Sequence, residues 1–135
     1  MNFEKKFEVF WKFFIDNGGY NVVLEGLRNT LIIAVLGLVI GIVIGTLIAT
    51  VRVVPKTNGI SKVLDALAKF YVNFFRGTPI VVQLLLFYYV LMPLLSTNLK
   101  SVPVAVVVFG LNSGAYISEI MRAGILSVDS GQMEG

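Results

Sequence analysis

Long apolar stretches separated by short polar ones dominate the pattern of the chain. Between Arg28 and Arg52 no residue is charged, and a helix of that length crosses a bilayer core of about 30 Å at about 1.5 Å per residue. Further apolar runs follow Pro79 and Ser101. The pattern predicts three membrane-spanning helices, near Leu24–Val51, Pro79–Leu95 and Val102–Leu126.

The first 17 residues follow a different pattern. Aromatic and apolar side chains recur there at helical spacing, with charged side chains opposite, and Asn17-Gly18-Gly19 ends the pattern. Such a helix suits the lipid interface, although packing against another subunit is the alternative. We therefore expect an amphipathic N-terminal helix over residues 1–17 and a transmembrane part over residues 18–135. The aromatic face comprises Phe3, Phe7, Phe10, Trp11, Phe14 and Ile15.

Small residues recur every four positions in the first predicted span. At this spacing they lie on one face of a helix and let another helix backbone approach closely. We expect this face to pack against a second helix. It comprises Gly37, Gly41, Gly45 and Ala49.

A bend is predicted after the second helical pattern. The polar residues between Ile60 and Phe75 keep to one stripe, which is typical of a helix that lies at the membrane surface or enters it obliquely. Gly77 then ends the pattern, Thr78 is a good N-cap, and Pro79 suits the first position of a new helix. A bend between two helices is thus predicted at Arg76, Gly77, Thr78 and Pro79.

A few polar residues fall inside the predicted spans. Polar groups at membrane depth face protein or a water-filled path. We hypothesise that these residues face the interior of the subunit, where they either contact a transported molecule or bond neighbouring helices. They are Gln83, Asn112, Tyr116 and Glu119.

The C-terminal stretch leaves the apolar pattern. Glu119 and Arg122 lie three residues apart, so they share a helix face. Asp129 and Gln132 form a predicted capping box, with Ser130 as an alternative N-cap. This pattern predicts a short polar helix beyond the last span, and an ordinary cytoplasmic loop is the other interpretation.

Composition and charge narrow the class of protein. Hydrophobic residues make up 56% of the chain and charged residues 14%, which is typical of a membrane protein. The chain has no cysteine and no histidine, so we expect no metal site and no Ser/His/Asp or Cys/His catalytic group. The small net charge gives no reason to expect nucleic acid. Five bases between Arg52 and Arg76 predict that this segment faces the cytoplasm and the N-terminus the outside.

Three segments together resemble a known family. SEI.RAGI.SVD.GQMEG at the C-terminus, RGTPIVVQ from Arg76 to Gln83 and GLRNTL from Gly26 to Leu31 are similar to permease subunits of polar amino acid ABC importers, the histidine, glutamine, arginine and cystine uptake type. The similarity begins near Gly18. Glu134 matches the glutamate of that family's Glu-Ala-Ala loop, with Gly135 where its first alanine usually stands. We therefore expect a C-terminally truncated permease.

The resemblance implies a fold and a function. The expected fold is an all-α membrane protein, with an N-terminal amphipathic helix and three transmembrane helices of the ABC importer permease fold, ending at the start of the cytoplasmic coupling helix. The expected function is to form the translocation path for a polar amino acid in the cell (inner) membrane of a prokaryote. An ATPase would dock at the coupling helix, at Asp129, Ser130, Gly131, Gln132 and Glu134.

The resemblance also implies partners and a division of labour. The sequence has no G-x-x-x-x-G-K-[ST] motif, so the chain is expected to be non-catalytic, without a cofactor of its own, while the partner ATPase binds ATP and Mg. A second permease subunit, identical or related, and an extracellular or periplasmic substrate-binding protein complete the expected importer.

Other classes of membrane protein predict other features. A small helical subunit that anchors another complex without transporting anything would lack the docking helix and the polar residues of the third span. A channel would show rings of like charge or a filter-like loop. A secondary transporter half would show inverted repeats.

Overall fold

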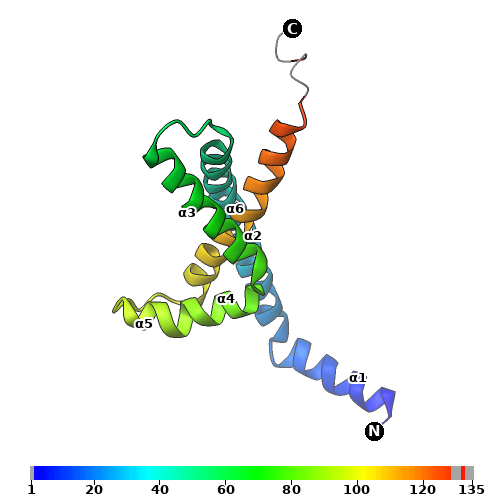
Figure 1. Cartoon of the computed structure of the whole chain (residues 1–135). Helices are drawn as coiled ribbons and strands as arrows, with labels where there is room; N and C mark the ends of the chain where they lie inside the picture. Colours follow the sequence, from blue (N-terminus) through cyan, green and yellow to red (C-terminus); the bar gives the residue numbers. More distant parts are fainter. Residues whose placement is uncertain (1, 129–131, 133–135) are drawn as a thin grey trace. The chain divides into compact units, whose positions relative to one another are not determined.

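The computed structural model describes residues 2–128 and 132. Every regular element in these residues is a helix, which confirms the all-α fold class. The chain divides into two compact units, Met1–Ile32 and Ile33–Gly135. The helices are α1 (Phe3–Trp11), α2 (Gly19–Val53), α3 (Gly59–Gly77), α4 (Ile80–Leu86), α5 (Met92–Leu94) and α6 (Ser101–Leu126), with π-helical segments η1 (Lys12–Asp16) and η2 (Phe87–Leu91) (Figure 1).

The N-terminal unit contains the predicted amphipathic helix. It forms as α1 and continues through η1, and neither segment buries a residue. Phe7 stacks between Phe3 and Trp11, with ring centroids 6.4 and 6.2 Å away. The chain then turns at Gly18, whose φ of 70° favours glycine. Gly19 begins α2, and a Cβ there would lie 2.8 Å from the carbonyl oxygen of Phe13.

Helices α2 and α6 are each long and apolar enough to cross a membrane. In the second unit they lie side by side and run in the same direction, because successive positions of α2 meet successive positions of α6. A Cβ on Gly37 would lie 3.1 Å from the Cβ of Phe109, and one on Gly45 would lie 2.9 Å from the Cβ of Ile117. Two parallel spans require the segment between them to cross back.

The returning segment is a broken helix. Helix α3 and the stretch from α4 to α5 are together long and apolar enough to cross a membrane, and they are bent by 108°. The stretch Ile80–Leu94 alone is about 22 Å long at about 1.5 Å per residue, which is short of a bilayer core of about 30 Å. Together with α3, the predicted span Pro79–Leu95 is long and apolar enough to cross a membrane as one bent pair.

Helix α3 packs against α6. Its buried residues, Asp65, Ala68, Val72 and Phe75, recur at helical spacing on one face. The hydroxyl of Tyr71 donates a hydrogen bond to the carbonyl oxygen of Leu111 on α6. These contacts favour oblique insertion of α3 over a position flat on the surface. The helix starts at a capping box in which the Asn58 side chain accepts from the backbone N–H of Ser61 at 2.9 Å.

The caps at the bend differ from the prediction by one residue. Thr78 is the C-cap of α3, and Pro79 is the N-cap of α4. A residue before proline is pushed towards extended backbone, and Thr78 has φ −114° and ψ 143°. The carbonyl oxygen of Pro79 accepts the first hydrogen bond of α4, from the N–H of Gln83 at 3.2 Å, so the helix begins at Ile80.

Candidate functional site

The predicted stripe of small residues lies at the contact between α2 and α6. Gly37, Gly41, Gly45 and Ala49 are all buried. A Cβ on Gly41 would collide with the Ser113 side chain, so a larger residue there would push the helices apart.

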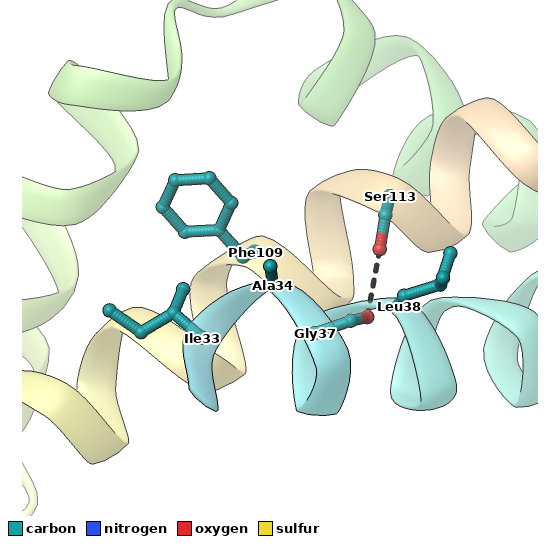
Figure 2. Close-up of a pocket in the computed structure, with 6 residues that line it drawn as sticks. All are labelled: Ile33, Ala34, Gly37, Leu38, Phe109 and Ser113. Carbon is teal, nitrogen blue, oxygen red and sulfur yellow. Dashed lines mark hydrogen bonds between the residues drawn. The ribbon is translucent and has the colours of Figure 1, made fainter. Parts of the chain in front are cut away.

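The same contact is reciprocal, because α6 carries glycines of its own. A Cβ on Gly110 would lie 2.6 Å from Cγ2 of Ile40, and one on Gly114 would lie 3.0 Å from Cγ2 of Ile44. Figure 2 shows the Ser113 hydroxyl, which donates a hydrogen bond to the carbonyl oxygen of Gly37 at 3.0 Å. Each helix thus receives side chains of the other, and the fit is close on both sides.

A hollow beside this contact is apolar. It has a volume of about 290 Å³ and is lined by Ile33, Ala34, Gly37, Leu38, Phe109 and Ser113 (Figure 2). Its visible polar groups, the Ser113 hydroxyl and the Gly37 carbonyl, are bonded to each other. The hollow therefore offers little to a polar ligand and suits a lipid chain or an apolar side chain better.

Glu119 is half-buried between two arginines. Its carboxylate lies 2.7 Å from Nη1 of Arg52, on α2, and 2.5 Å from Nη2 of Arg122, on α6. The side chains of Arg52 and Glu119 are 12% and 23% exposed, so solvent screens this pair only in part. The sequence prediction paired Glu119 with Arg122 and missed Arg52, which is far away in the sequence.

A second ion-pair group joins α2 and α3. Asp65 is buried, and its carboxylate lies 3.0 Å from Nζ of Lys69 and 3.3 Å from Nζ of Lys56. Lys56 also donates a hydrogen bond to the carbonyl oxygen of Arg52 at 2.7 Å. Lys56 contacts both Asp65 and the carbonyl oxygen of Arg52, so the two groups meet where α2 ends. Charged contacts there hold the end of α2 to α6 and the loop after α2 to the first half of α3.

Gln83 lies at the bend between α3 and α4 and is 1% exposed. Its Nε2 donates to the carbonyl oxygen of Phe75 at 3.0 Å and to Oγ1 of Thr78 at 2.8 Å. In an unbroken helix the Phe75 carbonyl would accept from the N–H of residue 79, and Pro79 has none. The Gln83 side chain supplies the missing donor and so stabilises the bend.

Asn112 and Tyr116 lie one turn apart on α6 and keep more solvent contact. Tyr116 is 43% exposed and Asn112 is half-buried. The guanidinium carbon of Arg76, at the end of α3, lies 5.6 Å from the centroid of the Tyr116 ring. The structure thus brings Tyr116, one of the four predicted path residues, together with Arg76, while Gln83 and Glu119 are engaged elsewhere.

Arg76 was predicted as part of the bend and as the last of five bases facing the cytoplasm; the structure instead places its guanidinium beside Tyr116 of α6. Its sequence position carried a further signal: it is the last charged residue before an uncharged stretch that extends to Lys100. Tyr116 is the partner that the structure adds.

The predicted docking residues are described in one case only. Gln132 is exposed, whereas Asp129, Ser130, Gly131 and Glu134 lie outside the described residues. Within residues 2–128 and 132, no group of three or more His, Cys, Asp or Glu side chains is placed to hold a metal ion.

A family of membrane proteins matches the region that contains these features. The family described as the binding-protein-dependent transport system inner membrane component matches residues 37–135, a range that includes the bend, the α2–α6 contact and both ion-pair groups. The chain belongs to this family.

Two curated proteins that are similar in sequence to this chain are named as transport system permeases. The chain is 40% identical over 116 residues to a putative glutamine transport system permease protein of Rickettsia prowazekii (strain Madrid E), covering 83% of this chain and 49% of that protein. It is 40% identical over 112 residues to the arginine transport system permease protein ArtQ of Bacillus subtilis (strain 168), with the same coverage.

A solved structure gives the same assignment. The crystal structure of an amino acid ABC transporter with histidines matches with a TM-score of 0.71 and 32% identity, over 90% of this chain and 54% of that chain. These matches confirm the family resemblance. The chain spans about half the length of the curated relatives that it matches.

Proposed function

We propose that the chain forms part of the transmembrane permease of an ATP-driven importer of a polar amino acid. The observation that carries this proposal is the family match over residues 37–135. Relatives that align with most of the chain are named as glutamine and arginine permeases. The family description names an inner membrane component, and the location that we propose is the inner membrane of a prokaryote.

The parallel pair α2 and α6 would form a stable wall of the translocation path. Its close glycine contact and the Arg52–Glu119 ion pair hold the two helices together, while the broken helix between them carries the bend. Asn112 and Tyr116 would face the path, since both keep solvent contact at positions inside the span.

The partners follow from the family. A separate ATPase would bind ATP and Mg and dock at Asp129, Ser130, Gly131, Gln132 and Glu134. A second permease subunit would complete the path, and a binding protein outside the membrane would deliver the amino acid. Closure of the ATPase pair would move the docking stretch and, through α6, the spans.

Amino acid uptake in the source cell tests the proposal. We expect deletion of the gene for this chain to reduce uptake of at least one of radiolabelled glutamine, arginine and cystine, and we expect re-expression to restore it. Affinity purification of the tagged chain from native membranes should recover an ABC ATPase. Unchanged uptake of all three amino acids, with recovery of a complex that has no ATPase, would favour the anchoring subunit instead.

A further inference from the structure

We propose that Arg76 binds the carboxylate of the transported amino acid, with Tyr116 holding its guanidinium in place. This inference rests on the proposed function and assigns a subsite within the path. It starts from one juxtaposition, the Arg76 guanidinium over the Tyr116 ring at 5.6 Å. The two residues come from different helices, α3 and α6, and the broken helix brings them together.

The position of this pair is inside the span. Tyr116 is about 22 Å along α6 from Ser101 and about 15 Å from Leu126, at about 1.5 Å per residue. The Arg76 guanidinium lies beside Tyr116, so it is about one turn further from the C-terminal end of α6 than Glu119. The stretch of α6 from Ser101 to Ser118 carries no charge.

Arg76 has no carboxylate partner within the described part of the chain. The four ion pairs there engage Arg52, Lys56, Lys69 and Arg122, and Arg76 is exposed. An unpaired cation at this depth is costly against lipid, so it faces a water-filled path or an anionic partner. A guanidinium fits a carboxylate with two parallel hydrogen bonds.

The neighbouring groups fit the remainder of an amino acid. The aromatic face under the guanidinium adds a cation–π contact and leaves the N–H donors at its edge available. The amide of Asn112 and the hydroxyl of Tyr116 lie one turn apart on the same face of α6 and have acceptor oxygens for an α-ammonium group. The subsite therefore selects a free α-amino acid by its carboxylate.

Ligand binding to the purified complex tests the inference directly. The complex is isolated from native membranes with its own partners, placed in nanodiscs and assayed without the binding protein, since that protein would add a selectivity of its own. The probes are radiolabelled glutamine and arginine, in competition with the same amino acids and with their α-carboxamides, which lack the negative charge.

We expect the native complex to prefer an amino acid over its amide and Arg76→Gln to lose that preference by about tenfold or more, the effect of one charge-assisted hydrogen bond. Arg76→Lys should retain part of the preference, and Tyr116→Leu should reduce it. Lys62→Gln, an exposed cation on the same helix, is the matched control and should bind as the native complex does.

Two results would overturn the inference. One is an unchanged preference in Arg76→Gln while all partner subunits are retained. The other is loss of a partner subunit from purified Arg76→Gln with an unchanged preference, which would assign Arg76 to an acidic residue of that subunit. Both are distinct from failure of the proposed function, in which deletion of the gene leaves uptake unchanged.

Discussion

Single glycines determine how closely α2 and α6 approach. At Gly41 a Cβ would collide with the Ser113 side chain and lie 3.2 Å from the backbone nitrogen of Gly114. Backbone atoms cannot move out of the way as the end of a flexible side chain can, so the added methyl group would separate the helices. By contrast, a Cβ on Gly124, also helical, would meet nothing within 4 Å.

We expect Gly41→Ala to lower the free energy of unfolding by about 1–3 kcal/mol, the usual range for overpacking a close contact. Gly124→Ala is the matched control and should be neutral or stabilising by up to about 1 kcal/mol, because alanine favours the helix. Thermal unfolding of the detergent-purified protein measures both. Equal unfolding temperatures for the two variants would contradict the close contact.

Glu119 is the residue that joins two arginines of different helices. Its replacement by glutamine keeps the size of the side chain but leaves Arg52 and Arg122 without their shared anion. We expect Glu119→Gln to destabilise the protein by about 1.5–3 kcal/mol, the range for hydrogen bonds to charged groups. Glu25→Gln, at an exposed position of α2, serves as the control in the same unfolding measurement. An equal change in the free energy of unfolding for both variants would show that the ion pair does not stabilise the protein.

At the scale of elements, the bend between α3 and α4 is the feature that needs explanation. Pro79 removes a backbone donor from the first helix and forces Thr78 into extended backbone. The Gln83 side chain then donates to the orphan carbonyl of Phe75. One side chain therefore fixes the geometry of a helix break that the backbone alone would leave with an unpaired group.

Removal of the Gln83 amide should loosen this bend. Gln83→Leu leaves the carbonyl of Phe75 without its donor, which we expect to cost about 1–3 kcal/mol. Because the chain has no cysteine, spin labels introduced at the exposed positions Val63 and Tyr89 report the distance across the bend without further changes. The distance distribution should broaden in Gln83→Leu and stay narrow in Val82→Leu; an unchanged distribution would show that other contacts set the angle.

Sequence periodicity predicted the elements better than their connections. The stripe Gly37, Gly41 and Gly45 was visible because helical faces are encoded locally. The caps at Thr78 and Pro79 were displaced by one residue, since N-cap preference and pre-proline sterics compete there. The link from Arg52 to Glu119 joins residues 67 positions apart, and the pairing of Arg76 with Tyr116 likewise depends on the bend; neither leaves a periodic signal in the sequence.

At the scale of the whole molecule, the parallel direction of α2 and α6 constrains the topology. Both helices must leave the membrane on the same side, and the broken helix returns between them. The bases around the loop after α2, Arg52, Lys56 and Lys62, predict that this side is the cytoplasm. The short connection near Thr97 then faces the outside.

Labelling of single cysteines tests this topology. We expect a cysteine at Asn58 to react with a membrane-impermeant maleimide only after the cells are opened, because the loop after α2 faces the cytoplasm, and a cysteine at Thr97 to react in intact cells. The cysteine-free parent protein is the control. The reverse order of reactivity would invert the assignment.

Docking of an ATPase is a second property of the whole assembly. An unpaired charge at an interface is costly, so Glu134 is expected to meet a basic group or an N–H donor, and its loss should weaken docking by about 2–5 kcal/mol. Glu134→Ala should therefore reduce recovery of the ATPase with the tagged chain while membrane insertion is unchanged. Unchanged recovery and uptake, as for a solvated surface acid, would reject the docking role.

Glycines recur every four residues on the face of α2 that contacts α6. If α2 moved by four residues along α6, glycines would again face α6. A slide of about 6 Å along the axis, which is four residues at about 1.5 Å each, would bring each glycine opposite the residue that its neighbour now contacts. The Arg52–Glu119 ion pair does not repeat in this way, so the slide would break it. The hydrogen bond from Ser113 to the Gly37 carbonyl would break as well. The ion pair and this hydrogen bond therefore favour the observed alignment of the two helices over one shifted by four residues.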